Sequence, residues 1–140
     1  MKILILILIS VSSAFAATDF PYSVKFELGK VDFAPGDNIT ISAIHGTSHE
    51  IQTNGTYLVE GTYTLTSREE ALLSLSIAVD GSGITPTDSK QRMKIAKGQG
   101  KFNLIITMHE QGYPHISFYP ADKGTVFGGI YFGKGMSLLK

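Results

Sequence analysis

The sequence predicts an all-β protein, a single-domain β-sandwich of immunoglobulin-like or jelly-roll type with about eight or nine short antiparallel strands. Apolar and polar residues alternate with a period of two along most of the chain, which is the spacing of a half-buried strand. Turn-forming clusters of Gly, Pro, Asn and Asp separate these segments, and no strand–helix–strand alternation is visible. With 43% hydrophobic and 17% charged residues, the chain is also too apolar for intrinsic disorder.

Residues 1–16 have the pattern of a signal peptide. A short positive segment precedes an apolar run from Ile3 to Ile9, and Ala14-Phe15-Ala16 supplies small residues at the cleavage positions. The run is shorter than the roughly 20 residues of a membrane-spanning helix. We therefore expect cleavage after Ala16, one domain over residues 17–140, no membrane span after cleavage, and a secreted or periplasmic location.

Composition narrows the classes of partner. The chain balances 12 Lys and Arg against 12 Asp and Glu, which argues against electrostatic binding of nucleic acid. It contains no Cys, which excludes disulfides, thiolate nucleophiles and Cys-ligated zinc. We expect no cofactor and no nucleic-acid partner, and an unidentified protein or carbohydrate as the partner.

The first strands follow the leader directly. Apolar and polar residues alternate over 23–28, and Ala34–Asn38 then has the composition of a tight turn. The alternation resumes at Ile39 and Ile41. The dipeptide Asn54-Gly55 predicts a type I′ hairpin turn, because both residues tolerate a positive φ.

The middle of the chain is expected to form two strands, over 57–65 and 71–79. Gly61 in the first predicts a bulge or a close backbone neighbour. Residues 67–70 resemble a helix-capping box, but the period-two pattern that follows is incompatible with a helix. We predict a strand with at most one helical turn before it.

Short strands separated by glycine-rich turns make up the rest. Residues 80–89 are expected to be a polar loop, and Lys97–Gly100 to form the turn of a hairpin. The strands are expected over 92–95, 102–106, 115–119, 126–127 and 130–132.

Two histidines and a carboxylate lie within six residues, and they are the first candidates for a metal site. They are His45, His49 and Glu50. Together with the strand ending at Gly61, this segment resembles the first motif of the cupins, which bind a metal inside a jelly roll. Aligned on Gly61, His49 matches the second histidine of the motif, but Thr47 and Asn54 occupy the positions of its first histidine and its glutamate. The resemblance implies an alternative function as a small cupin-like metal-dependent enzyme.

His109 and His115 flank the turn at Glu110–Pro114. In a hairpin they would lie near one another on adjacent strands and could add ligands to a metal or acid–base site. The alternative is that they are ordinary surface histidines at a hairpin end.

Positive residues cluster late in the chain. They are Lys90, Arg92, Lys94, Lys97 and Lys101. On a strand, the first three would share one face while Met93 and Ile95 enter the core. This pattern suits either an anion-binding surface or an edge strand protected against aggregation, and we predict the second.

Three tyrosines are candidates for an aromatic binding surface: Tyr113, Tyr119 and Tyr131. They would form a sugar-stacking platform if they faced water together, although the absence of Trp argues against a strong one.

No catalytic template fits the chain. It lacks a Gly-x-Ser-x-Gly motif, a phosphate-binding loop and facing carboxylates. We therefore predict a non-catalytic binding or structural module. A small outer-membrane β-barrel is a further alternative, because alternating strands also suit lipid on one side.

Overall fold

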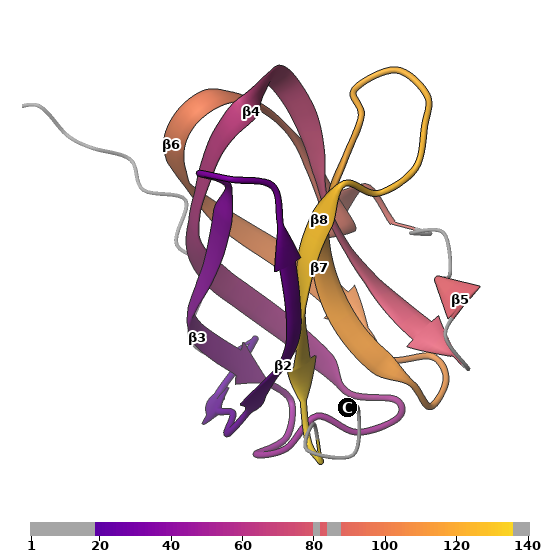
Figure 1. Cartoon of the computed structure of the whole chain (residues 1–140). Helices are drawn as coiled ribbons and strands as arrows, with labels where there is room; N and C mark the ends of the chain where they lie inside the picture. Colours follow the sequence, from indigo (N-terminus) through magenta and orange to yellow (C-terminus); the bar gives the residue numbers. More distant parts are fainter. Residues whose placement is uncertain (1–18, 80–81, 84–87, 136–140) are drawn as a thin grey trace, which may run out of the picture.

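The computed structural model describes residues 19–79, 82–83 and 88–135, and the predicted signal peptide over 1–16 lies outside them. These residues form an all-β fold, as predicted, without an α-helix (Figure 1). None of their helical segments has the length and apolarity needed to cross a membrane. The elements are β1 (Tyr22–Ser23), β2 (Glu27–Phe33), β3 (Asn38–Gly46), β4 (Thr56–Val79), β5 (Ser82–Gly83), the 3₁₀ turn η1 (Ser89–Gln91), β6 (Arg92–Thr107), β7 (Tyr113–Tyr119) and β8 (Gly128–Gly133).

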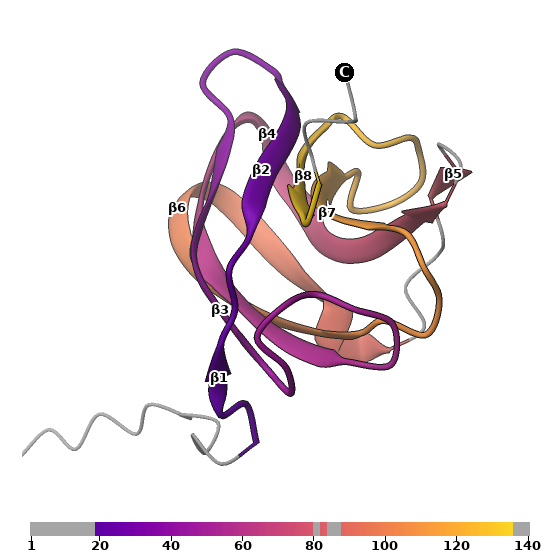
Figure 2. The same cartoon turned by 90° about the horizontal axis from the view of Figure 1, so that it is seen from below.

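All strands pair antiparallel in one sheet of order β1-β3-β4-β7-β8-β2, with β5 and β6 also paired to β4. β6 follows β4 along both of its halves. On the other edge of β4, β3 pairs with residues 57–64 and β7 with residues 72–78. The sheet curls into a half-barrel as a result (Figure 2). The sandwich and the strand count that the sequence predicts are not confirmed.

β4 and β6 are each continuous where the sequence predicts two strands. Leu65 pairs with Gly98 and Glu70 with Ala96, so β4 has four residues where β6 has one, Lys97. The predicted hairpin turn at Lys97–Gly100 is therefore wrong: the segment is a bend, with Gly98 at a φ of 120°. Hydrogen bonding between β4 and β6 resumes on both sides of this β-bulge, which bends both strands without ending them.

Asp37 binds the extra residues of β4. Its carboxylate accepts hydrogen bonds from the backbone N–H groups of Thr66 at 2.8 Å and Ser67 at 3.0 Å, and also from both hydroxyls. Burial by itself would raise the pKa of Asp37, but these hydrogen bonds outweigh it and lower the pKa. Ser67 is thereby engaged with Asp37, so the predicted strand forms here without a helical turn. A capping box does form elsewhere, between Asp88 and Gln91 at η1.

The concave side of the sheet holds the core. Alternate residues of β3 and of β6 over 102–106 are buried there, as the period-two pattern predicts. β2 has no buried residue, although the sequence predicts Leu28 on the core face, and β7 is buried at five consecutive positions. Gly61 has the close neighbours expected of it, because a Cβ at this position would collide with the carbonyl oxygen of Thr40. The largest fully buried apolar side chains are Tyr57, Phe102, Phe118, Phe132, Ile44, Leu65, Leu73, Leu75, Leu104, Ile116 and Val59.

The loop between β3 and β4 differs from the predicted type I′ turn. Asn54 has a φ of 70°, but Gly55 is not in the left-handed region. The loop is longer than a two-residue turn because residues 47–55 wrap around the hydroxyl of Tyr57. That hydroxyl donates to the carbonyl oxygen of Glu50 at 2.7 Å and accepts from the N–H of Gln52 at 2.9 Å.

We predict that replacing Asp37 by Asn destabilises the fold by about 2 kcal/mol, because hydrogen bonds to a charged group contribute roughly 1.5–3 kcal/mol. The measurement is urea unfolding at pH 7.

This stabilisation should depend on pH. Because folding lowers the pKa of Asp37, its contribution to the free energy of unfolding is present above the pKa of the unfolded state, about 3.9, and disappears as the pH falls through the folded-state value. The matched control is Asp122→Asn on an exposed loop, and equal stability of the two variants would contradict the prediction.

Candidate functional site

The second half of β4 and strands β7, β8 and β2 present one face away from the core. Residues directly opposite one another in antiparallel strands share a face. Leu73, Leu75 and Ile116 point into the core, so their neighbours along the strands point outward. These cross-strand rows, which we call the outer face, are Lys94, Leu72 and Tyr119; Arg92, Ser74, Ser117, Gly129 and Asp32; Ser76, His115 and Tyr131; and Ala78 and Tyr113.

His115 lies at the centre of the outer face. Its Nδ1 is 2.6 Å from the hydroxyl of Ser117 and its Nε2 is 3.1 Å from the hydroxyl of Ser76. A neutral imidazole suits these two partners, because one ring nitrogen donates and the other accepts. The side chain is 7% exposed, and burial lowers its pKa. His115 is therefore a neutral group that joins β4 to β7.

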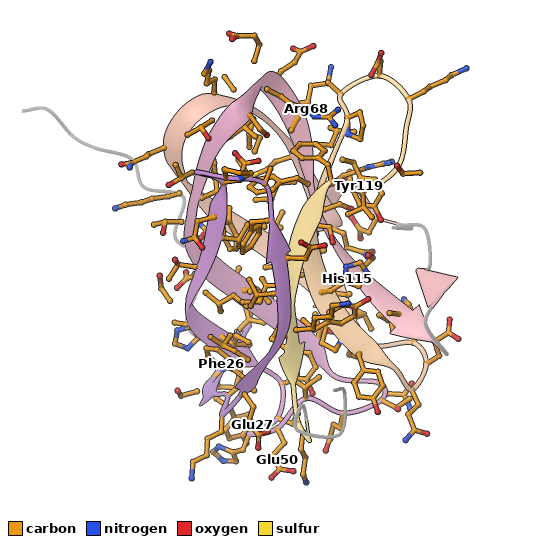
Figure 3. The ribbon with its side chains drawn as sticks, viewed as in Figure 1. Phe26, Glu27, Glu50, Arg68, His115 and Tyr119 are labelled. Atoms are coloured by element: carbon orange, nitrogen blue, oxygen red, sulfur yellow. The ribbon has the colours of Figure 1, made fainter. Side chains whose placement is uncertain are left out.

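Of the three candidate tyrosines, Tyr119 and Tyr131 lie near one another on this face, whereas Tyr113 is at the opposite end of β7 from Tyr119. Tyr131 lies beside His115, with 5.0 Å between the ring centroids. Tyr119 lies close enough to Tyr131 that the two phenol groups interact electrostatically; burial raises the pKa of Tyr119, and Tyr131 adds to the effect. Each of the three, Tyr113 included, is half-buried. Figure 3 shows Tyr119 and His115 following one another along β7.

A pocket of about 310 Å³ opens on the outer face beside Gly129. A Cβ at Gly129 would lie 2.7 Å from both the carbonyl oxygen of Ile116 and the hydroxyl oxygen of Ser117, so the close approach of β7 requires glycine at this position. The lining comes from β7 through His115 and Ser117, from β2 through Lys30 and Asp32, and from residues 126–131 of β8 and the segment before it. We call this cavity the Gly129 pocket.

Five residues of the site were not among those predicted from the sequence: Lys30, Asp32, Ser76, Ser117 and Gly129. Part of the signal was present, because Tyr113, His115, Ser117 and Tyr119 are spaced in steps of two on one strand. The sheet order places the second half of β4 beside β7 and places β2 beside β8, and this order is not visible in the sequence.

The candidate metal ligands do not converge. His45 Nε2 lies 4.0 Å from Glu60 Oε2, and the ring of His49 packs against Tyr22 at 4.4 Å between centroids. Glu50 Oε2 binds Lys134 Nζ at 2.8 Å. Among the residues that the structure describes, no group of three or more His, Cys, Asp or Glu side chains could hold a metal ion.

The predicted hairpin between His109 and His115 is wrong. β6 and β7 lie on opposite edges of β4, so the two histidines are not on adjacent strands. His109 is exposed just after β6, whereas His115 is buried on the outer face.

The five predicted cations are spread over more than one element. Lys90 belongs to η1, and Lys97 pairs with Glu69 at 3.2 Å. Arg92 and Lys94 are exposed along β6, with Lys101 exposed beyond the bend; as predicted, Ile95 is buried and Met93 packs against the core. Within the described ranges β6 pairs with β4 alone, so its other edge is open.

We predict that Arg92→Thr combined with Lys94→Thr increases aggregation, because charged residues on an open strand edge hinder pairing with another sheet. Threonine fits a strand, so the fold is retained. Light scattering of concentrated protein measures the effect. Unchanged scattering, together with loss of salt-sensitive retention on an acidic polysaccharide column, would instead identify an anion-binding surface.

We also predict that stability falls as the pH drops below about 6.5, the pKa of an unfolded histidine, because burial lowers the pKa of His115 in the folded state. Below about pH 6.5 the unfolded chain takes up a proton on this histidine more readily than the folded protein does, so acidification favours unfolding. Urea midpoints at pH 7.5 and 5.5 measure the effect. His115→Gln should remove the pH dependence and His109→Gln should retain it; the same dependence in both variants would rule out His115 as its source.

Comparison of the chain with protein-family models, curated proteins and solved structures finds no match. Function follows from the chemistry of a site rather than from a fold class.

Proposed function

We propose that the protein is a secreted or periplasmic non-catalytic binding module whose ligand occupies the Gly129 pocket. The observation that carries the proposal is the arrangement around this pocket. An aromatic ring, Tyr131, and two charged side chains, Lys30 and Asp32, line a cavity whose floor lacks a side chain at Gly129. Concave sites with a few well-placed polar groups are typical of small-molecule recognition.

A carbohydrate fits this lining best. The flat ring of Tyr131 is half-exposed and offers a surface for the apolar face of a sugar. The carboxylate of Asp32 accepts and the ammonium group of Lys30 donates, and both are exposed, so sugar hydroxyls can form charge-assisted hydrogen bonds with them. The cavity of about 310 Å³ is at the lower end of the usual range for ligand pockets, which favours one sugar unit over a long chain.

The lining also favours binding over hydrolysis. Glycosidases generally use two carboxyl groups on either side of the scissile bond. Of the described residues that line the pocket, Asp32 is the one carboxylate. His115 is paired through both ring nitrogens with Ser76 and Ser117, so neither nitrogen is left over to activate a water molecule.

We predict that the protein binds a glycan identified on a glycan array, and that Tyr131→Ala weakens this binding at least about tenfold, which corresponds to roughly 1.4 kcal/mol. Asp32→Asn should weaken it less, because the amide still accepts a hydrogen bond. Calorimetric titration of the identified glycan measures both effects.

Tyr22→Ala is the matched control, because Tyr22 is 41% exposed, packs against His49 and is not among the residues that line the pocket. Its affinity should equal that of the unmodified protein. An array without a bound glycan, or full affinity in Tyr131→Ala, would contradict the proposal. Release of shortened glycan during incubation would show that the site is catalytic.

A further inference from the structure

A second and larger pocket, of about 650 Å³, lies at the end of the half-barrel where the β3–β4 loop, the β6–β7 connection and the end of β8 meet. Figure 2 looks onto the molecule from this side. None of its lining residues belongs to the Gly129 pocket. We call it the end pocket.

The wall formed by the β3–β4 loop is fixed by internal hydrogen bonds. Tyr57 is 1% exposed, and its hydroxyl binds the backbone of Glu50 and Gln52 and lies 2.7 Å from the hydroxyl of Ser48. A buried hydroxyl with this many partners holds a loop in one conformation. The pocket wall over 51–53 is therefore formed before any ligand binds.

The other walls are tied to this loop. The N–H of Asn54 donates to the carbonyl oxygen of Met108 at 2.7 Å, and the N–H of Met108 donates to the carbonyl oxygen of Gly55 at 2.9 Å. Lys134, which follows β8, reaches across to Glu50. Three separate segments are thus connected around one cavity, and a preformed cavity binds a ligand without the entropic cost of ordering its walls.

The lining is apolar at its base and donor-rich at its rim. Met108 is 2% and Ala78 is 3% exposed, and Ile51 packs against the core beside them. The polar side chains at the pocket are two glutamines, a threonine, Tyr113 and Lys134, and no carboxylate is among the described lining residues. Such a lining suits a molecule with an apolar body and an end group rich in hydrogen-bond acceptors.

Lys134 supplies the charge. Its ammonium group carries three donors, and Glu50 takes one of them at 2.8 Å. Both partners are more than half exposed, so the pair is weak and a ligand can share the ammonium group. The hydrogen bond from Lys134 to Glu50 raises the pKa of Lys134, which keeps the amine charged.

We propose that the end pocket binds a small amphipathic carboxylic acid, with its apolar chain against Met108, Ala78 and Ile51 and its carboxylate at Lys134. The proposal does not depend on the carbohydrate site. It assigns to the end of the half-barrel a ligand of a different chemical class from the one proposed for the outer face.

The first test compares three probes with the same eight-carbon chain and different end groups: sodium octanoate, 1-octanol and octylamine. Each is titrated into the purified protein and detected by displacement of the fluorescent anion 8-anilinonaphthalene-1-sulfonate. Octanoate should bind about tenfold more tightly than octylamine, with octanol between them. Equal affinities for octanoate and octylamine, or no saturable binding of octanoate, would overturn the proposal.

The second test fills the pocket. Gln111→Trp places a large ring at the lining and should weaken octanoate and octanol about tenfold, whereas Gln99→Trp, at an exposed position of β6 outside the lining, should leave both unchanged. The chain has no other Trp, so the indole introduced in each variant also reports on its surroundings. Octanoate should shift the tryptophan emission of the Gln111→Trp variant and leave that of the Gln99→Trp variant unchanged. Unchanged binding by Gln111→Trp would place the probes elsewhere.

The third test separates charge from volume. Glu50→Gln frees Lys134 and should strengthen octanoate binding severalfold, while Lys134→Gln should weaken it severalfold; octanol should bind both variants equally. Tyr131→Ala should not change octanoate binding, and its effect on the glycan is measured separately. A loss of octanoate binding in Tyr131→Ala would show that the probe occupies the Gly129 pocket instead.

Discussion

The carboxylate of Asp37 holds the bend on which the shape of the sheet depends. Four residues of β4 face one residue of β6 at the bulge, and the backbone N–H groups of Thr66 and Ser67, displaced from regular strand pairing, are satisfied by Asp37. Thr66 and Ser67 are exposed, but Asp37 is only 6% exposed, and hydrogen bonds to a charged group contribute about 1.5–3 kcal/mol. Because β4 bends here, its two halves run in different directions. β3 pairs antiparallel with the first half and β7 with the second, on the same edge, and the sheet can therefore enclose a core on its concave side.

Both halves of β4 contribute to the candidate sites, and Ala78, beyond the bend, lines the end pocket. Beyond the bend, β4 places large apolar residues on the inner face and small polar residues on the outer one, because Ser74 and Ser76 alternate with Leu73 and Leu75. The small side chains of Ser74 and Ser76 on the outer face leave room for the rings of His115 and Tyr131. Before the bend, β4 begins with Tyr57, whose hydroxyl orders the loop at the end pocket. One long strand thus supports a pocket on a sheet face and another at the end of the half-barrel.

Period-two alternation predicted the all-β class and many of the buried residues, because side chains on a pleated strand point to alternate faces. The strand expected over 126–127 does not form, and the segment 23–28 is split between β1 and β2. The alternation also failed at the continuity of β4 and β6. Residues 67–70 resemble a capping box and residues 97–100 a hairpin turn, because polar residues and glycine also occur at bulges. The conformation of the first segment depends on Asp37, which lies 29 residues before Thr66. The same limit applies to the site: the spacing of Tyr113, His115 and Tyr119 was visible, but their neighbours Asp32 and Ser76 come from strands that only the sheet order brings alongside.

The buried histidine shows why perturbed titration alone is a weak sign of catalysis. A general base must lie within hydrogen-bond reach of the proton that it abstracts and needs a pKa near the working pH. Burial moves the pKa of His115 downward, and Ser76 and Ser117 occupy both nitrogens, so the ring acts as a rigid polar bridge within the sheet. In the proposed binding site its role would be to position Tyr131, whose ring packs against it with 5.0 Å between centroids. A tyrosine held in this way loses little side-chain entropy on contact with a ligand, which favours recognition by a preformed surface over chemistry at the imidazole.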